Sequence, residues 1–126
     1  MDESDITFPG LLILRTEGRL HFASAPRARE KMRALGEAAR PQVFVLEMSA
    51  VPDIEYTALT GFEREIAGLL ENGVEVWLAT PNPRVLTLIE RSSLGDLLGK
   101  ERIFYNLYEV IEADQRRAGP RVPPAA

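Results

Sequence analysis

The chain has 126 residues, the size of one ordinary domain, and its 45% hydrophobic content is enough to build one core. A formal net charge of −4 argues against a nucleic-acid partner, because proteins bind nucleic acid largely by neutralising phosphates. Cysteine is absent from the sequence, which excludes disulfides, zinc–thiolate sites and thiol catalysis.

The two ends of the chain differ in composition from its middle. The acidic start lacks the basic and apolar pattern of a secretion signal, and the apolar runs of the sequence are too short to span a bilayer. Residues 1–8 are predicted to be a lead-in linker and residues 9–117 a single domain. The Gly- and Pro-rich composition of residues 118–126 predicts a disordered tail.

The first half of the domain is predicted to contain a hairpin and a helix. Residues 11–17 form an apolar strand candidate, and a turn separates them from a short second strand at residues 20–22. Apolar residues spaced by three and four predict a helix over residues 25–39. Ser24 is the expected N-cap of this helix, and Pro41 ends it.

The second half alternates strands and helices. A strand buried on both faces is predicted at residues 43–46, and a helix with an apolar stripe follows and stops at Asn72-Gly73. A third helix opens at Pro81-Asn82-Pro83, with breaks at Gly95 and Gly99. The remaining predicted elements are strands at residues 74–79 and 103–104 and a last helix capped by Asn106 and Glu109.

This order of elements predicts an α/β fold with a mixed sheet, parallel in its middle, and about four helices. The sequence offers few groups for catalysis. His21 is the only histidine and lies in a predicted strand with no partner pattern, which favours a structural role. Gly95 and Gly99 lack the spacing and the lysine of a phosphate-binding loop. We therefore expect no enzyme activity, no metal site and no cofactor.

The helix predicted at residues 25–39 carries a run of basic side chains. Such a surface suits an anionic lipid or an acidic patch of a protein partner. The alternative, which is commoner, is the solvated side of an amphipathic helix. The basic residues are Arg27, Arg29, Lys31 and Arg33.

Residues 53–59, Asp-Ile-Glu-Tyr-Thr-Ala-Leu, follow a predicted core strand and open a predicted helix. This segment resembles the signature loop of STAS domains, a fold shared by the tails of SulP sulfate transporters and by anti-sigma factor antagonists. Transporter members typically have Asp-Ile-Asp-Ser-Thr-Gly-Leu here. The matching positions are Asp53, Ile54, Thr57 and Leu59, with a conservative change at Glu55 and departures at Tyr56 and Ala58.

Further segments resemble the transporter branch in the same order along the chain. Residues 20–25 are similar to its Leu-Tyr-Phe-Ala-Asn-Ala opening, and residues 45–49 resemble its Val-Leu-Asp-Met-Ser strand end. The other similar segments are residues 9–10, 91–94, 102–104 and 109–113. Together these resemblances cover nearly the whole domain and imply the STAS (anti-sigma factor antagonist-like) fold.

The resemblance implies a regulatory or interaction domain of a SulP-type sulfate or anion transporter, without enzyme activity. It implies a soluble domain on the cytoplasmic side of the cell membrane, as part of an integral membrane transporter. The expected partner is the membrane domain of the parent transporter or a regulatory protein, and no nucleic acid is expected. A homodimer and nucleotide binding are left open.

The alternative function is a stand-alone anti-sigma factor antagonist. In those proteins a Ser or Thr at the loop–helix junction is phosphorylated by a partner kinase, which breaks the complex, and Thr57 occupies this position. The resemblance thus implies a regulatory loop with Thr57 as phospho-acceptor and Thr60 as a weaker one, and the opposing structural interpretation makes Thr57 only the N-cap of its helix. The loop residues singled out are Asp53, Glu55, Tyr56, Thr57 and Thr60.

Overall fold

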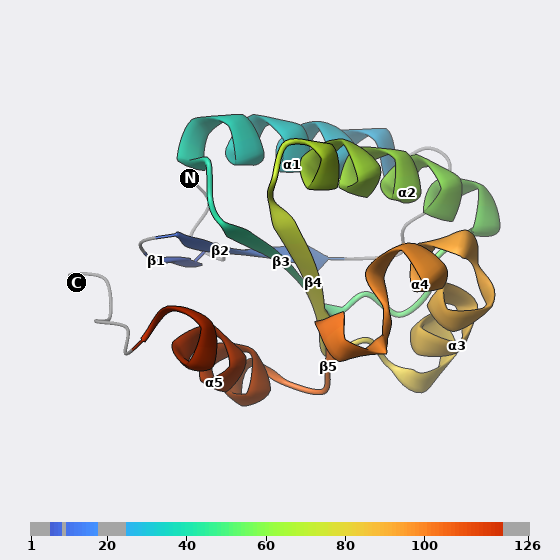
Figure 1. Ribbon diagram of the computed structural model, residues 1–126. Coiled ribbons are helices and arrows are strands. Elements are labelled where there is room, and N and C mark those ends of the chain that lie inside the picture. Colours follow the sequence, from blue (N-terminus) through green and yellow to red (C-terminus); the bar gives the residue numbers. More distant parts are fainter. Residues whose placement is uncertain (1–5, 9, 18–24, 120–126) are drawn as a thin grey trace.

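The computed structural model of the chain describes residues 6–8, 10–17 and 25–119, and it places a central sheet between two layers of helices (Figure 1). The sheet has five strands in the order β1-β2-β3-β4-β5. The first pair is antiparallel and the other three pairs are parallel. The strands are β1 (Ile6–Phe8), β2 (Leu11–Glu17), β3 (Val43–Ala50), β4 (Glu75–Ala79) and β5 (Ile103–Phe104).

Four helices pack on one face of the sheet and a single helix packs on the other (Figure 1). The prediction of about four helices falls one short in the described residues, because the chain after β4 forms two short helices in succession. The helices are α1 (Ala25–Ala39), α2 (Tyr56–Glu71), α3 (Pro83–Arg91), α4 (Ser93–Leu98) and α5 (Leu107–Ala118), with a short 3-10 helix, η1, at Lys100–Arg102.

The core has two parts because the central strands are buried on both faces. In β3, Phe44 and Leu46 face α1 to α4, whereas Val43 and Val45 face α5. A strand with two buried faces needs an unbroken apolar run, which is why the sequence signal at residues 43–46 is continuous. The predicted parallel centre of the sheet is confirmed, with Trp77 of β4 lying beside Val45 of β3.

The antiparallel pair at the start of the sheet differs from the predicted hairpin. Residues 6–8 form β1 and pair with β2, so the interpretation of residues 1–8 as only a lead-in is wrong for this segment. Gly10 has a φ of 80° at the turn, which a glycine adopts without strain. The predicted turn and strand at residues 18–22 and the N-cap Ser24 lie outside the described residues.

Several helix ends follow the sequence signals. Asn106 accepts a hydrogen bond from the Glu109 amide at 2.9 Å, so the predicted N-cap is confirmed. The returning bond of the predicted capping box is displaced by one residue, because Glu109 accepts from the amide of Tyr105, the residue before the N-cap, at 2.7 Å. The break after α3 falls at Ser92, not at Gly95, which lies inside α4. No helix in the described ranges combines the length and the apolar character needed to cross a membrane.

Candidate functional site

The loop predicted to be functional connects the end of β3 to the start of α2. It lies at the carboxyl edge of the parallel strands, where open α/β sheets usually bind ligands. Val51 and Ile54 are 1% and 4% exposed and anchor the loop in the core. The polar residues between and after these two anchors are therefore held at fixed places on the surface.

Asn82 ties this loop to the start of α3. Its Nδ2 donates to the carbonyl oxygens of Val51 and Pro52 at 3.2 and 3.1 Å, while its Oδ1 accepts from the Val85 amide at 2.9 Å. One side chain thus caps a helix and satisfies two loop carbonyls. Sequence reasoning finds Asn82 at the opening of a helix, but it has no signal for the contact with the loop.

Asp53 is directed towards α3 and not towards α2. Its Oδ1 accepts from the Ile54 amide at 2.9 Å and lies 3.3 Å from Nε of Arg84, whose side chain is 74% exposed. The first contact is a local turn that rigidifies the loop, and the second is a solvent-exposed ion pair of small energetic value. Asp53 therefore shapes the loop.

The start of α2 gathers the other predicted site residues. Glu55 is the N-cap, with φ −73° and ψ 141°, and its carbonyl oxygen accepts from the Ala58 amide at 2.9 Å. Thr57 consequently lies in the first helical turn, so the interpretation of Thr57 as the N-cap is wrong. The Thr57 hydroxyl donates to Glu55 Oε1 at 3.3 Å, and the Thr60 hydroxyl donates to the Thr57 carbonyl at 2.8 Å.

The site residues divide into two groups. Asp53 is half-buried and bonded to the loop, whereas Glu55, Tyr56, Thr57 and Thr60 are exposed on one turn of helix. Tyr56 is 69% exposed, less than Tyr105 and Tyr108, and tyrosine is a residue type enriched where proteins contact partners. Thr57 and Thr60 also line an open pocket shared with α1, which sequence reasoning did not find because it joins distant segments.

A strained residue lies on the same edge of the sheet. Thr80, which follows β4, has a φ of 58°, a left-handed conformation that is costly for a β-branched side chain. Its amide donates to the Phe104 carbonyl at 2.8 Å, which anchors the turn to the end of β5. Such strain tends to occur near functional sites, and here it sets the direction of the chain into Asn82 and α3.

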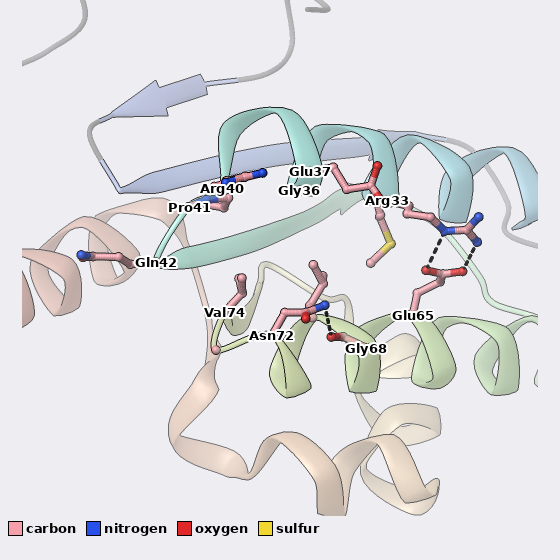
Figure 2. Close-up of a pocket in the computed structure, with 13 residues that line it drawn as sticks. Arg33, Gly36, Glu37, Arg40, Pro41, Gln42, Glu65, Gly68, Asn72 and Val74 are labelled. Carbon is pink, nitrogen blue, oxygen red and sulfur yellow. Dashed lines mark hydrogen bonds and ion pairs between the residues drawn. The ribbon is translucent and has the colours of Figure 1, made fainter.

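The largest cavity described lies at the opposite end of the α1–α2 pair, near the amino ends of β3 and β4 (Figure 2). It is an open groove of about 580 Å³. Arg33 of α1 and Glu65 of α2 close one side of it with two hydrogen bonds, one of which joins Arg33 Nε to Glu65 Oε2 at 3.4 Å (Figure 2). The Glu65 carboxylate raises the pKa of Arg33 above its usual value, through its hydrogen bond and its negative charge.

The described residues contain no group of three or more His, Asp or Glu side chains arranged to hold a metal ion. His21 lies outside the described residues. The chemistry that the loop and α2 offer is therefore hydrogen bonding, charge and an accessible hydroxyl.

Comparisons with known proteins agree on one family. Residues 5–110 match the family model described as STAS domain. High affinity sulfate transporter 1 of Stylosanthes hamata is 28% identical to the chain over 113 residues, which are 82% of this chain and 17% of that protein. The chain thus spans less than a fifth of the length of this relative.

Two solved structures share the fold. The SulP transporter STAS domain from Vibrio cholerae superimposes with a TM-score of 0.73 at 23% identity, covering 88% of this chain and 86% of that chain. The anti-sigma factor antagonist SpoIIAA, in its unphosphorylated form, superimposes with a TM-score of 0.63 at 18% identity, covering 90% of this chain and 92% of that chain. At these identities the likeness concerns the fold alone.

Proposed function

The chain belongs to the STAS domain family, and from this premise we propose that it is the regulatory or interaction domain of a SulP-type sulfate or anion transporter. In this role it has no enzyme activity, lies on the cytoplasmic side of the membrane and acts by contact with other protein surfaces. The observation that carries the proposal is the 28% identity to a sulfate transporter over 82% of the chain.

The partner in this proposal is the membrane domain of the parent transporter or a regulatory protein. The loop after β3 suits such contacts, because its backbone is anchored by buried residues while Tyr56 and Thr57 project into solvent. A rigid loop loses little conformational entropy on docking, and an exposed aromatic ring supplies contact area. The resulting contact would couple the position of the domain to transport.

The test is the size and location of the native protein. Cells of the source organism are separated into membrane and soluble fractions, washed with alkaline carbonate and probed with an antibody against this domain. We expect a carbonate-resistant membrane band several times larger than the 14.0 kDa of this chain. A soluble band near 14.0 kDa would contradict the proposal.

A functional test follows in the parent transporter. Removal of the domain is expected to reduce anion uptake or surface assembly, while the membrane part is still made. Uptake and surface levels that match those of the intact transporter would contradict a regulatory role.

The alternative function, a stand-alone anti-sigma factor antagonist, is favoured by one observation. Thr57 is exposed in the first turn of α2, where a phosphate would lie beside the Glu55 carboxylate and change the surface charge. This alternative predicts a tight complex with a kinase-like anti-sigma factor. Thr57→Glu should abolish that complex, and Thr87→Glu serves as the matched control because it places the same charge on an exposed threonine of α3, outside the loop and α2. Equal binding by the two variants would contradict the switch.

A further inference from the structure

Arg29 of α1 carries a buried donor that nothing satisfies. Its Nε is inaccessible to solvent and has no hydrogen-bond partner among the residues that the structure describes. The guanidinium packs flat against Gly61 of α2, so closely that a Cβ at this position would lie 2.7 Å from Nη1 and 2.9 Å from Nε of Arg29. A buried donor without an acceptor costs about 1–3 kcal/mol, so native structures rarely keep one without a reason. Because Nε itself is covered by the protein, an acceptor from outside the chain can reach this guanidinium only where Arg29 lines the neighbouring pocket.

An open pocket of about 300 Å³ lies beside Arg29, between α1 and the first turns of α2. A second guanidinium, that of Arg64, and two hydroxyl groups line the same pocket. Its described lining is Pro26, Arg29, Thr57, Ala58, Thr60, Gly61 and Arg64. The pocket thus combines two permanent positive charges with hydroxyls that can rotate to donate.

The charges around the pocket favour an anion. Within the described part of the chain, neither Arg29 nor Arg64 forms an ion pair. The carboxylate that opposes an anion is Glu55, whose Oε1 accepts from the Thr57 hydroxyl at 3.3 Å. The Thr60 hydroxyl is directed to the Thr57 carbonyl at 2.8 Å. Two cations therefore face one carboxylate at the rim.

We propose that this pocket binds a tetrahedral oxyanion: sulfate, phosphate or the phosphate group of a monoester. A guanidinium presents its donors in a fixed fork that matches two oxygens of such an anion, and charged donors make the strongest hydrogen bonds of this kind. Arg29 and Arg64 both line the pocket and supply its charged donors. The site goes beyond the proposed function, and it is the same for a transporter domain and for a stand-alone protein.

The proposal is tested by NMR on the 126-residue chain labelled with nitrogen-15. Sodium sulfate, sodium phosphate and glycerol 3-phosphate are titrated separately, with ionic strength held constant by sodium chloride. We expect a saturable shift of the Arg29 Nε–H resonance and of the Thr60 and Gly61 amides. Tighter binding of glycerol 3-phosphate than of the inorganic ions would assign the site to a phosphate carried on a larger molecule, and the reverse order to a free ion.

Three variants locate the site. Arg29→Gln and Arg64→Gln should each weaken binding about tenfold, the usual size for loss of one charged hydrogen-bond donor. Gly61→Ala should weaken binding while both arginines remain, because the new Cβ displaces the Arg29 guanidinium. The matched controls are Arg91→Gln, an exposed arginine of α3, and Gly68→Ala, which meets nothing within 4 Å on the same helix as Gly61.

Two results would overturn the proposal. One is a shift that grows linearly without saturation, or that sodium chloride alone reproduces, in the unaltered chain. The other is equal affinity in the Arg29→Gln, Arg64→Gln and Arg91→Gln variants while their amide spectra show a folded domain. Either result would mean that the pocket between α1 and α2 does not bind an oxyanion.

Discussion

At two consecutive turns of the α1–α2 contact, an arginine of α1 lies against α2, but the residue that it meets on α2 differs. At one turn, Arg33 of α1 meets Glu65 of α2 and the two form an ion pair. One turn earlier on both helices, Arg29 meets Gly61, where no side chain can supply a negative charge. The two contacts lie one turn apart on both helices, and α2 contributes a carboxylate to one and a glycine to the other.

The difference separates a structural contact from a binding site. Arg33 has its acceptor within the chain, and Glu65 raises its pKa. Among the described residues Arg29 has no acceptor; its guanidinium fills the space over Gly61 and lines the open pocket beside it. An ion pair that forms on folding stabilises the native state only weakly when it lies at the surface. A charge that has no partner in a pocket is available to a ligand.

The largest effect is expected from neither arginine but from the apolar residues beneath them. Ile66 of α2 is fully buried in the larger core, next to both contacts. Ile66→Ala should lower the free energy of unfolding by about 2–5 kcal/mol, because it removes buried methyl groups and leaves a cavity. Urea unfolding measures this loss. The control is Leu97→Ala in α4, where the side chain is 38% exposed and the change should be about 0.5 kcal/mol.

A comparably large loss from Leu97→Ala would show that the two sites do not differ as their burial indicates. In that case the packing of α1 against α2 could not be taken as rigid, and a comparison of the Arg29 and Arg33 turns would not be justified.

Gly61→Glu should give Arg29 a carboxylate partner on α2, as Glu65 does for Arg33. The new carboxylate lies beside the Arg29 guanidinium and takes the place of the external anion. We expect oxyanion affinity to fall at least about tenfold, while the domain stays folded. The same titrations measure it, with Gly68→Glu as a control that adds the same charge two turns further along α2. Equal losses in both variants would show that net charge, and not the pocket, governs binding.

Glu65→Gln should have the opposite effect, because it removes the carboxylate that pairs with Arg33. The expected result is a small decrease in the midpoint of thermal unfolding that added salt removes, because the pair is exposed and screened. Thermal unfolding at low and high salt measures it, with Glu112→Gln in α5 as a control for an exposed pair within one helix. A large decrease that persists in high salt would mean that the pair is a main support of the helix contact.

Much of the fold could be predicted because its signals are local. The apolar spacing of α1 and the double burial of β3 fix both elements from a few neighbouring residues. The sequence does not predict the strand at residues 6–8, because three residues are too few to show the alternation of a strand. The sequence predicts a break at Gly95 and not at Ser92, because a glycine suggests a break even where its missing side chain serves close packing. A Cβ at Gly95 would lie 2.6 Å from the Ile89 carbonyl oxygen, so the helix needs glycine there for space.

The candidate site could be predicted only in part. The segment around Asp53 and Thr57 is contiguous, so a family pattern makes it visible in sequence. The contact of Asn82 with the loop and the pocket between Arg29 and Arg64 depend on side chains brought together by the packing of separate elements. A run of basic residues on a helix predicts a charged face, but it cannot show which arginine has a carboxylate opposite it and which has a glycine.

The smallest expected change in the free energy of unfolding comes from the two glycines of α2, Gly61 and Gly68. Gly68→Ala should raise the free energy of unfolding by about 0.5–1 kcal/mol, because alanine favours the helix and meets nothing at this position. Gly61→Ala should raise the free energy of unfolding by less, because its Cβ must displace the Arg29 side chain. Urea unfolding with and without sulfate measures both variants, since a ligand that binds only the native state stabilises it. Sulfate should stabilise the unaltered chain and Gly68→Ala but have little effect on Gly61→Ala. Equal stabilisation of all three proteins would mean that anion binding does not depend on the position of the Arg29 guanidinium over Gly61. The Arg29 and Arg33 turns would then differ in their contribution to stability and not in ligand binding.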